Sequence, residues 1–162
     1  GPLIVMNNKG ILVSRLADEN EIKLLKKSTG LPVERLLSRY TSAGNLISAN
    51  DKGVIASTLL KDMENQIVDV LDAPVEFITI ASFNQVGALM VSGNEGSAIH
   101  PQALDEEITK AAKILKVDVE PITINRGLPY IASGIILTKE KAIVGSLTTG
   151  PELIMLSRIF KL

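Results

Sequence analysis

The chain has no cysteine among its 162 residues. A cysteine nucleophile, a disulfide and a thiolate-ligated metal site are therefore excluded, and the composition fits a reducing compartment such as the cytoplasm, where we expect the protein to act. Aromatic residues make up only 3% of the chain, which argues against a platform on which bases stack. No apolar run approaches the roughly 20 residues that are needed to span a bilayer.

An excess of positive charge is also missing. The chain has 17 Lys and Arg residues against 18 Asp and Glu residues, a formal net charge of −1. This balance disfavours an unselective nucleic-acid binder, which needs a basic excess, but it leaves room for a local basic patch. A hydrophobic content of 46% over this length fits one globular domain with a real core.

What the chain does have is an internal repeat with a period of about 44 residues. Three similar phrases begin at Gly1, Gly44 and Gly87: GPLIVMNNKG, GNLISANDKG and GALMVSGNEG. A weaker fourth copy, ASGIILTKEK, begins at Ala132, and Val-Glu pairs recur at 33–34, 75–76 and 119–120. We therefore predict a single repeat domain over residues 1–162, with approximate repeats at 1–43, 44–86, 87–131 and 132–162.

Each unit is predicted to contain a hairpin, a helix and a third strand. The turn Asn50–Gly53 separates two short apolar runs, a pattern typical of a hairpin in which glycine supplies a positive φ. Pro32 and Pro74 are expected to end helices and begin the third strands. Lys141 stands where the other copies have the closing glycine. Because a left-handed non-glycine residue costs about 1 kcal/mol, we expect a different turn there.

Polar residues mark the predicted helix starts. Asp18 with Glu21, and Thr149 with Glu152, have the spacing of capping boxes. The acidic run at 105–107 is interpreted as the first turn of a helix, favoured by the helix dipole, rather than as a cation site.

Two further candidates receive a structural interpretation. His100 is the only histidine, and without an orienting partner it is interpreted as a loop residue rather than a base or ligand. Lys23, Lys26 and Lys27 are interpreted as a solvated helix face, with contact to RNA as the alternative. We predict neither a metal nor a cofactor.

One such unit cannot bury its own apolar face, whereas several arranged around an axis can. The predicted fold class is therefore α/β (α+β): a propeller of four ββαβ repeats about a pseudo-symmetry axis, with strands inside and helices outside.

Several motifs resemble the translation initiation factor 6 family in its archaeal form. They occur in family order, as GNLISANDKG (44–53), IHP (99–101), INRGLPYIASG (124–134) and VGSLTTGPEL (144–153). The resemblance implies the pentein fold, in which five ββαβ units surround a pseudo-fivefold axis. This chain matches the second to fifth units, so we expect the first to be absent. The start at Gly1-Pro2 is interpreted as a protease scar or as the interior of a longer chain.

The resemblance also implies a function. Family members bind the large ribosomal subunit beside a ribosomal protein near the sarcin–ricin loop, with ribosomal RNA as a further contact. They block joining of the small subunit sterically and take part in large-subunit biogenesis. Self-association through an open ring edge is expected here. Two alternatives stay open: a truncated pentein-type scaffold without ribosome affinity, and a guanidine-modifying pentein enzyme, which the absence of cysteine disfavours.

The position after each repeat glycine lies on one face of the disc in this family and carries functional residues, including an asparagine. The matching residues here are Pro2, Asn45, Ala88 and Ser133. A simple strand or turn cap is the alternative interpretation of Asn45. Arg126, in an Asn-Arg-Gly motif, is expected to contact a partner or to pack near the ring axis. The resemblance thus implies a ribosome-binding set of Asn45, Pro2, Ala88, Ser133 and Arg126.

Overall fold

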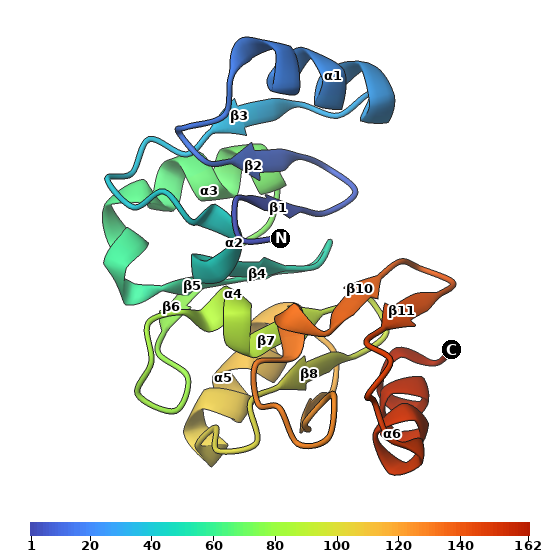
Figure 1. Cartoon of the computed structure of the whole chain (residues 1–162). Coiled ribbons are helices and arrows are strands. Elements are labelled where there is room, and N and C mark those ends of the chain that lie inside the picture. The colour runs from blue at the N-terminus through green and yellow to red at the C-terminus, as the bar shows by residue number, and fades with distance from the viewer.

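The structure, a computed structural model, describes all residues from Gly1 to Leu162. It is a mixed α/β protein with four small sheets and six α-helices (Figure 1). The first sheet and its helix are β1 (Ile4–Met6), β2 (Ile11–Val13), α1 (Glu19–Thr29) and β3 (Val33–Arg35). The second set is β4 (Ile47–Ala49), β5 (Val54–Ser57), the 3-10 segment η1 (Thr58–Met63), α3 (Glu64–Leu71) and β6 (Val75–Ile78).

The remaining elements follow the same order along the chain. The third set is β7 (Met90–Ser92), β8 (Ser97–Ile99), α5 (Asp105–Leu115) and β9 (Val119–Pro121). The fourth is β10 (Ile135–Leu137), β11 (Ala142–Val144) and α6 (Gly150–Phe160). A short helical turn precedes each of the last three hairpins: α2 (Ala43–Leu46), α4 (Val86–Leu89) and η2 (Ile131–Ser133).

Three of the sheets share one topology. In each, two strands form an antiparallel hairpin and the third strand pairs in parallel with the second, in the orders β1-β2-β3, β4-β5-β6 and β7-β8-β9. The fourth sheet contains only the antiparallel pair β10-β11. The predicted hairpin, helix and third strand are thus all present within residues 4–35, 47–78 and 90–121.

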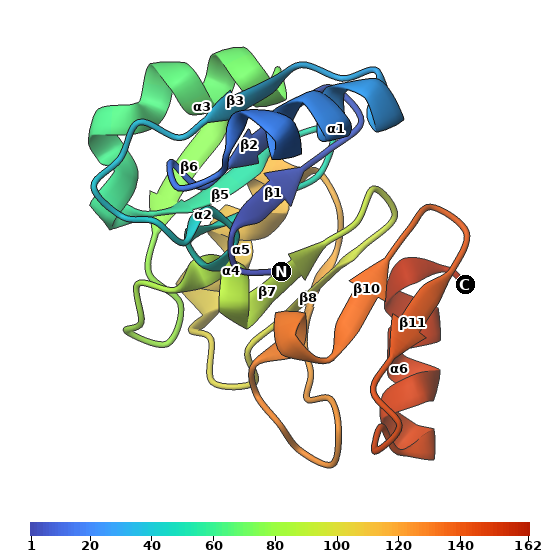
Figure 2. The same cartoon turned by 45° about the horizontal axis from the view of Figure 1, so that its top comes forward.

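The sheets lie side by side, and most of the helices lie at the periphery (Figures 1 and 2). The first strands of successive sheets contact one another, β1 against β4 and β4 against β7. Each of the first three sheets is also contacted by the helix that belongs to the next sheet, since α3 packs on β2, α5 on β5 and α6 on β8. No strand pairing joins one sheet to another, so the structure contains four separate small sheets and no closed barrel.

The predicted helix boundaries agree with the structure. The Asp18 side chain accepts the backbone N–H groups of Asn20 and Glu21, and Glu21 accepts the N–H of Asp18 in return, as a capping box requires. Helix α5 begins at Asp105, as the acidic run predicts. Helices α1 and α3 end three residues before Pro32 and Pro74, and the third strands begin just after these prolines.

The closing glycines have a different role from the predicted one. Gly10, Gly53 and Gly96 do not have positive φ angles. Instead, a Cβ at each of them would overlap a carbonyl oxygen near the C-terminal end of the helix that packs on its sheet. These are the carbonyl oxygens of Val70 in α3, Ile114 in α5 and Ile159 in α6, respectively. Glycine is therefore required because a helix backbone approaches closely, and our positive-φ interpretation is wrong.

The expected change of turn at Lys141 is also absent. The Thr138 N–H donates to the Lys141 carbonyl (2.8 Å), the same closure that joins Asn7 to Gly10 and Asn50 to Gly53. Lys141 is exposed, whereas Gly10, Gly53 and Gly96 are buried. A side chain fits at this position because the close approach that excludes it elsewhere does not occur here.

The apolar core follows these helix-on-sheet contacts. The central residues of β2, β5 and β8 are Leu12, Ile55 and Ala98, each fully buried and each in an apolar cluster with the helix that covers it. The matching residue of β11, Ile143, is 70% exposed, and its cross-strand partner Ile136 is 67% exposed. The outer face of the last hairpin is therefore an open apolar surface.

Candidate functional site

The predicted positions after the repeat glycines lie on consecutive short turns. Asn45 lies in α2, Ala88 in α4 and Ser133 in η2, and α4 packs against both of the other turns. Pro2 precedes β1, and its carbonyl oxygen accepts the N–H of Gly44 (2.8 Å). These four residues therefore occupy corresponding places in successive units. They form a row at the end of the hairpins that lies away from the hairpin turns.

The leading glycines make this row possible. A Cβ on Gly44 would overlap the carbonyl oxygens of Gly1 and Ile4, and a Cβ on Gly87 would overlap those of Gly44 and Ile47. Each short turn thus rests directly on the main chain of the preceding one. Glycine is therefore required at positions 44 and 87, whereas a Cβ on Gly1 would meet no atom within 4 Å.

The side chains of the row differ in their chemistry. Asn45 is half-buried, its main-chain N–H donates to the Ser42 carbonyl (3.0 Å), and its side-chain amide makes no hydrogen bond within the protein. Ser133 is exposed and donates to the Tyr130 carbonyl (2.7 Å). Ala88 is half-buried and Pro2 is exposed. Asn45 thus supplies the one free amide of the row.

Arg126 lies outside this row. It belongs to a left-handed turn, Asn125–Gly127, in which all three φ angles are positive. The Glu152 carboxylate at the start of α6 holds this turn by accepting the main-chain N–H groups of Arg126 (3.2 Å) and Gly127 (3.0 Å). The Arg126 side chain is exposed and makes no ion pair, so it is free to contact a partner.

Glu152 is the most strongly perturbed acid in the protein. Burial raises the pKa of its carboxyl, but hydrogen bonds from the N–H groups of Thr149 and Gly127 and from the hydroxyls of Thr123 and Thr149 lower the pKa to about 2. The predicted Thr149–Glu152 pair is present, since Glu152 accepts the Thr149 N–H at 2.8 Å. The ionised carboxylate therefore ties α6 to the turn at 125–127.

His100 is a buried loop residue. Its Nδ1 accepts the N–H of Gln102 (3.1 Å), and its ring lies between those of Phe83 and Tyr130 at centroid distances of 6.3 and 6.5 Å. Burial lowers the pKa of His100, and the negative charge of Glu107 opposes that shift. These contacts support the structural interpretation.

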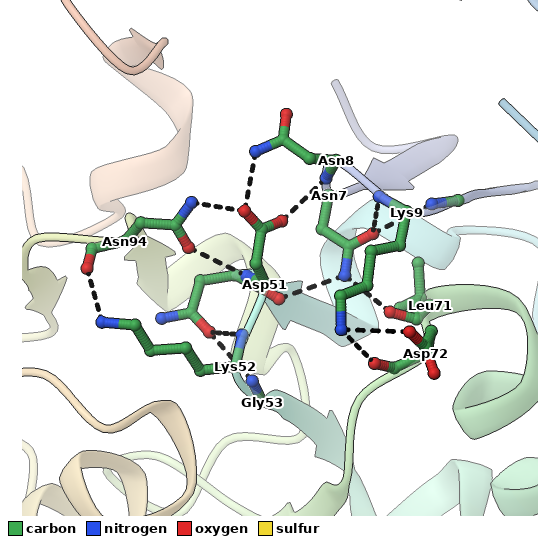
Figure 3. Close-up of polar contacts among 11 residues, drawn as sticks. Asn7, Asn8, Lys9, Asp51, Lys52, Gly53, Leu71, Asp72 and Asn94 are labelled. Carbon is green, nitrogen blue, oxygen red and sulfur yellow. Dashed lines mark hydrogen bonds and ion pairs between the residues drawn. The ribbon is translucent and has the colours of Figure 1, made fainter. Parts of the chain in front are cut away.

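The opposite ends of the hairpins carry a polar network that sequence reasoning missed (Figure 3). The Asp51 carboxylate accepts the side-chain amides of Asn8 (2.7 Å) and Asn94 (2.6 Å), and the Asn8 N–H at 2.8 Å. Burial raises the pKa of Asp51, but these hydrogen bonds, together with the charge of Lys9, leave the pKa below its ordinary value. The turns of three successive hairpins are thereby joined side by side.

Buried asparagines reinforce this network. Asn7 donates to the carbonyls of Asn50 (3.1 Å) and Leu71 (2.7 Å), and Asn50 donates to those of Gly93 and Leu115 (both 3.0 Å). The repeated Asn at 7 and 50 was a readable signal, because a buried asparagine at a constant place in a repeat indicates a side chain that satisfies neighbouring backbone groups.

Other predicted positions have simple surroundings. Lys23, Lys26 and Lys27 are exposed on α1. The structure contains no group of three His, Asp or Glu side chains placed to hold a metal ion. None of its helices combines the length and the apolar character that crossing a membrane would need.

The fold and this surface define a class: an α/β protein built from similar hairpin-and-helix elements, with amide, hydroxyl and lysine groups on its surface. The model of the eIF-6 family matches residues 1–159, so the chain belongs to that family.

Similar proteins are factors of archaea. A translation initiation factor 6 of Nitrosopumilus maritimus is 47% identical over 161 residues, which cover 99% of this chain and 73% of that protein. Those of Pyrobaculum aerophilum and Methanocaldococcus jannaschii are each 36% identical and cover 98% and 96% of this chain, and 72% and 71% of their own lengths. These relatives are named as translation initiation factors and not as enzymes, which supports a role in translation.

Proposed function

We propose that this protein binds the large ribosomal subunit and blocks joining of the small subunit, and that it also serves large-subunit biogenesis. The membership of the whole chain in the eIF-6 family and the names of its relatives support this proposal. The mechanism is steric obstruction, so the protein needs no catalytic group. Its place of action is the cytoplasm, where subunits join.

The proposed architecture is a pentein-like propeller. It consists of four ββαβ repeats, at about 1–43, 44–86, 87–131 and 132–162, around a pseudo-symmetry axis with strands inside and helices outside. The common order of the first three sheets and the regular packing of each helix on the preceding sheet support this arrangement.

The proposed contact surface is the row of short turns that carries Pro2, Asn45, Ala88 and Ser133. The observation that carries this choice is the stacking of α2, α4 and η2, which presents corresponding residues of successive units at one end of the molecule. A ribosomal protein near the sarcin–ricin loop is the proposed partner, and the free amide of Asn45 is the group that we expect to bind it. Arg126 adds a contact from the neighbouring turn.

Co-sedimentation with purified archaeal large subunits tests this proposal. We expect the protein to move into the subunit peak and Asn45→Glu to reduce the bound fraction at least about tenfold, because an interface centre loses affinity when it buries an unpaired charge. Glu64→Gln, on the exposed start of α3, is the control for a surface substitution. Absence of the wild-type protein from the peak would contradict the proposal, and equal loss in both variants would remove Asn45 from the site.

Self-association through the last hairpin is a further proposed property. Strand β11 has a hydrogen-bonded neighbour on one side only, and Ile136 and Ile143 are exposed beside it. An unpaired edge with an apolar face favours pairing with another chain. Light scattering should give a concentration-dependent mass that Ile143→Lys lowers to the monomer value. A monomer at all concentrations would contradict this proposal.

A further inference from the structure

The first junction is the place where the turn of the β1–β2 hairpin meets the C-terminal end of α3. There the Asn7 amide donates to the Leu71 carbonyl (2.7 Å). Lys9 Nζ reaches the residue after the helix, Asp72, donating to its main-chain carbonyl at 2.7 Å and pairing with its carboxylate at 3.1 Å (Figure 3). The lysine of this turn is therefore neutralised within the protein.

The second junction repeats this geometry between the β4–β5 turn and α5. The Asn50 amide donates to the Leu115 carbonyl (3.0 Å), and the residue after the helix is Lys116, in the left-handed conformation that Asp72 has at the first junction. The turn lysine is now Lys52, which donates to the Asn94 carbonyl (2.9 Å) and has no acidic partner (Figure 3).

The two junctions therefore have the same backbone and different charges. Two acidic positions of the first junction correspond to basic positions of the second: Asp69 to Lys113, and Asp72 to Lys116. The turn residue Asn8 corresponds to Asp51, whose carboxylate is held by the amides of Asn8 and Asn94. Lys113 and Lys116 are exposed and take part in no ion pair. The acids that neutralise the first junction have no counterpart at the second.

The second junction is also hollowed. An open groove of about 510 Å³ is lined by Lys52, Asn94, Glu95, Ala112, Lys113, Lys116, Val117, Asp118 and Lys161. Four lysines against two acids give the lining a formal charge of +2. The only internal ion pair in the groove joins Lys161 to Glu95 (3.2 Å), and both side chains are more than half exposed, so the pair neutralises little.

The helix dipole does not account for these lysines. A cation near the C-terminus of α5 gains up to about 1 kcal/mol from the dipole. The end of α3, however, reaches the same left-handed conformation with Asp69 and Asp72 in the corresponding places. The scaffold thus needs no cation at these positions, and the concentration of four lysines in one groove suits an anionic ligand.

We propose that this groove binds the phosphate backbone of RNA. Seven of its nine lining residues are charged or polar, so attraction between charges must supply the affinity, and an acidic peptide would find almost no apolar contact to anchor it. Lysines act as flexible point charges for phosphate, and the groove has no aromatic side chain on which a base would stack. Binding is therefore independent of sequence and sensitive to salt.

This surface is separate from the row of turns that carries Asn45. Each hairpin begins at the row and turns at the junction end, and its strands are three or four residues long. At about 3.3 Å per residue, the two surfaces lie on the order of 10 Å apart. A subunit-bound protein could therefore contact protein with one surface and RNA with the other.

The test is the titration of a short RNA duplex of arbitrary sequence with the full chain, by fluorescence anisotropy at several salt concentrations. We expect binding that weakens steeply with salt. Lys113→Asp with Lys116→Asp should weaken it more than tenfold and lower the salt slope by about 2, since each lost phosphate contact lowers the slope by about 0.9. Aspartate is tolerated here, because Asp69 and Asp72 occupy the corresponding places.

Two controls make the result decisive. Lys26→Asp with Lys27→Asp changes the net charge equally on α1 and should leave most of the binding intact. Asp69→Lys with Asp72→Lys should create a second basic junction and raise the affinity.

Three results would overturn the proposal. They are absence of RNA binding at low salt, equal loss in the α1 control, and tighter binding of polyglutamate than of RNA. Because free RNA replaces the subunit in this assay, its outcome is independent of whether the protein binds ribosomes.

Discussion

The first and second junctions have the same backbone arrangement but different charges. Both consist of a hairpin turn, a buried asparagine and a glycine pressed against the end of a helix. At the first, Lys9 is paired with Asp72, whereas at the second Lys52, Lys113 and Lys116 have no acidic partner. Backbone contacts therefore fix the geometry, and exposed side chains are left to vary. This division explains why the glycines and asparagines repeat while the charges do not.

The largest expected effect tests the shared geometry. Gly53→Val should destabilise the protein by about 3 kcal/mol or more, because its side chain would overlap the Ile114 carbonyl and a helix backbone must move. Gly10→Val should cost a similar amount at the first junction. Gly150→Ala, where a Cβ meets no atom within 4 Å, is the control and should be neutral or slightly stabilising. Urea denaturation measures all three, and a mild effect at Gly53 would show that the contact is not tight.

The next effect concerns the turn that Glu152 holds. Glu152→Gln should cost about 2 to 3 kcal/mol at pH 7, because a buried carboxylate that accepts several hydrogen bonds is lost. Glu107→Gln should cost less, since Glu107 accepts only the N–H groups of Leu104 and Ala81.

The pH dependence of the same variant has a definite sign. The pKa of Glu152 is lowered from its ordinary value of 4.5 to about 2 in the folded protein. Its contribution is therefore fully present above pH 4.5 and is lost as the pH falls through about 2. Denaturation curves of the wild type and of Glu152→Gln should converge over this range, and a constant difference would contradict the assignment.

The asparagines at the two junctions should behave alike. Asn50→Ala and Asn7→Ala each remove two donated hydrogen bonds to carbonyls and leave buried groups unpaired, which should cost about 2 kcal/mol. Thermal or urea denaturation compares them directly. A much smaller cost at one junction would show that the two networks are not equivalent.

The smallest expected effect is that of the exposed charges on stability. Asp72→Asn breaks the Lys9 pair, but Asp72 is 79% exposed and the cost should stay below about 1 kcal/mol and vanish in high salt. Lys116→Asn, which breaks no pair, should cost still less. A large loss in either variant would mean that these charges serve folding rather than binding.

The period of the sequence predicted most of the local structure. The hairpin turns, the helix caps at Asp18 and Thr149 and the starts of the third strands all follow from local patterns of glycine, asparagine and proline. The wrong predictions concern residues whose reason lies in a distant segment. Gly53 is a glycine because of Ile114, and Lys141 is tolerated because its position is exposed.

The site was harder to predict for the same reason. The family resemblance indicated Asn45 and its counterparts, and the structure aligns four of these positions while Arg126 lies on another turn. The lysine groove stayed hidden because Lys52, Lys116 and Lys161 are far apart in the sequence. Comparing position 69 with 113 and position 72 with 116 would have revealed the change of charge.

The most direct test of the proposed function is a subunit-joining assay with purified archaeal ribosomal subunits, followed by light scattering. We predict that the protein lowers the amount of joined ribosomes in proportion to the large subunits it occupies, and that Asn45→Glu does so only at much higher concentration. Unchanged joining at a protein concentration that saturates the large subunit would contradict the account.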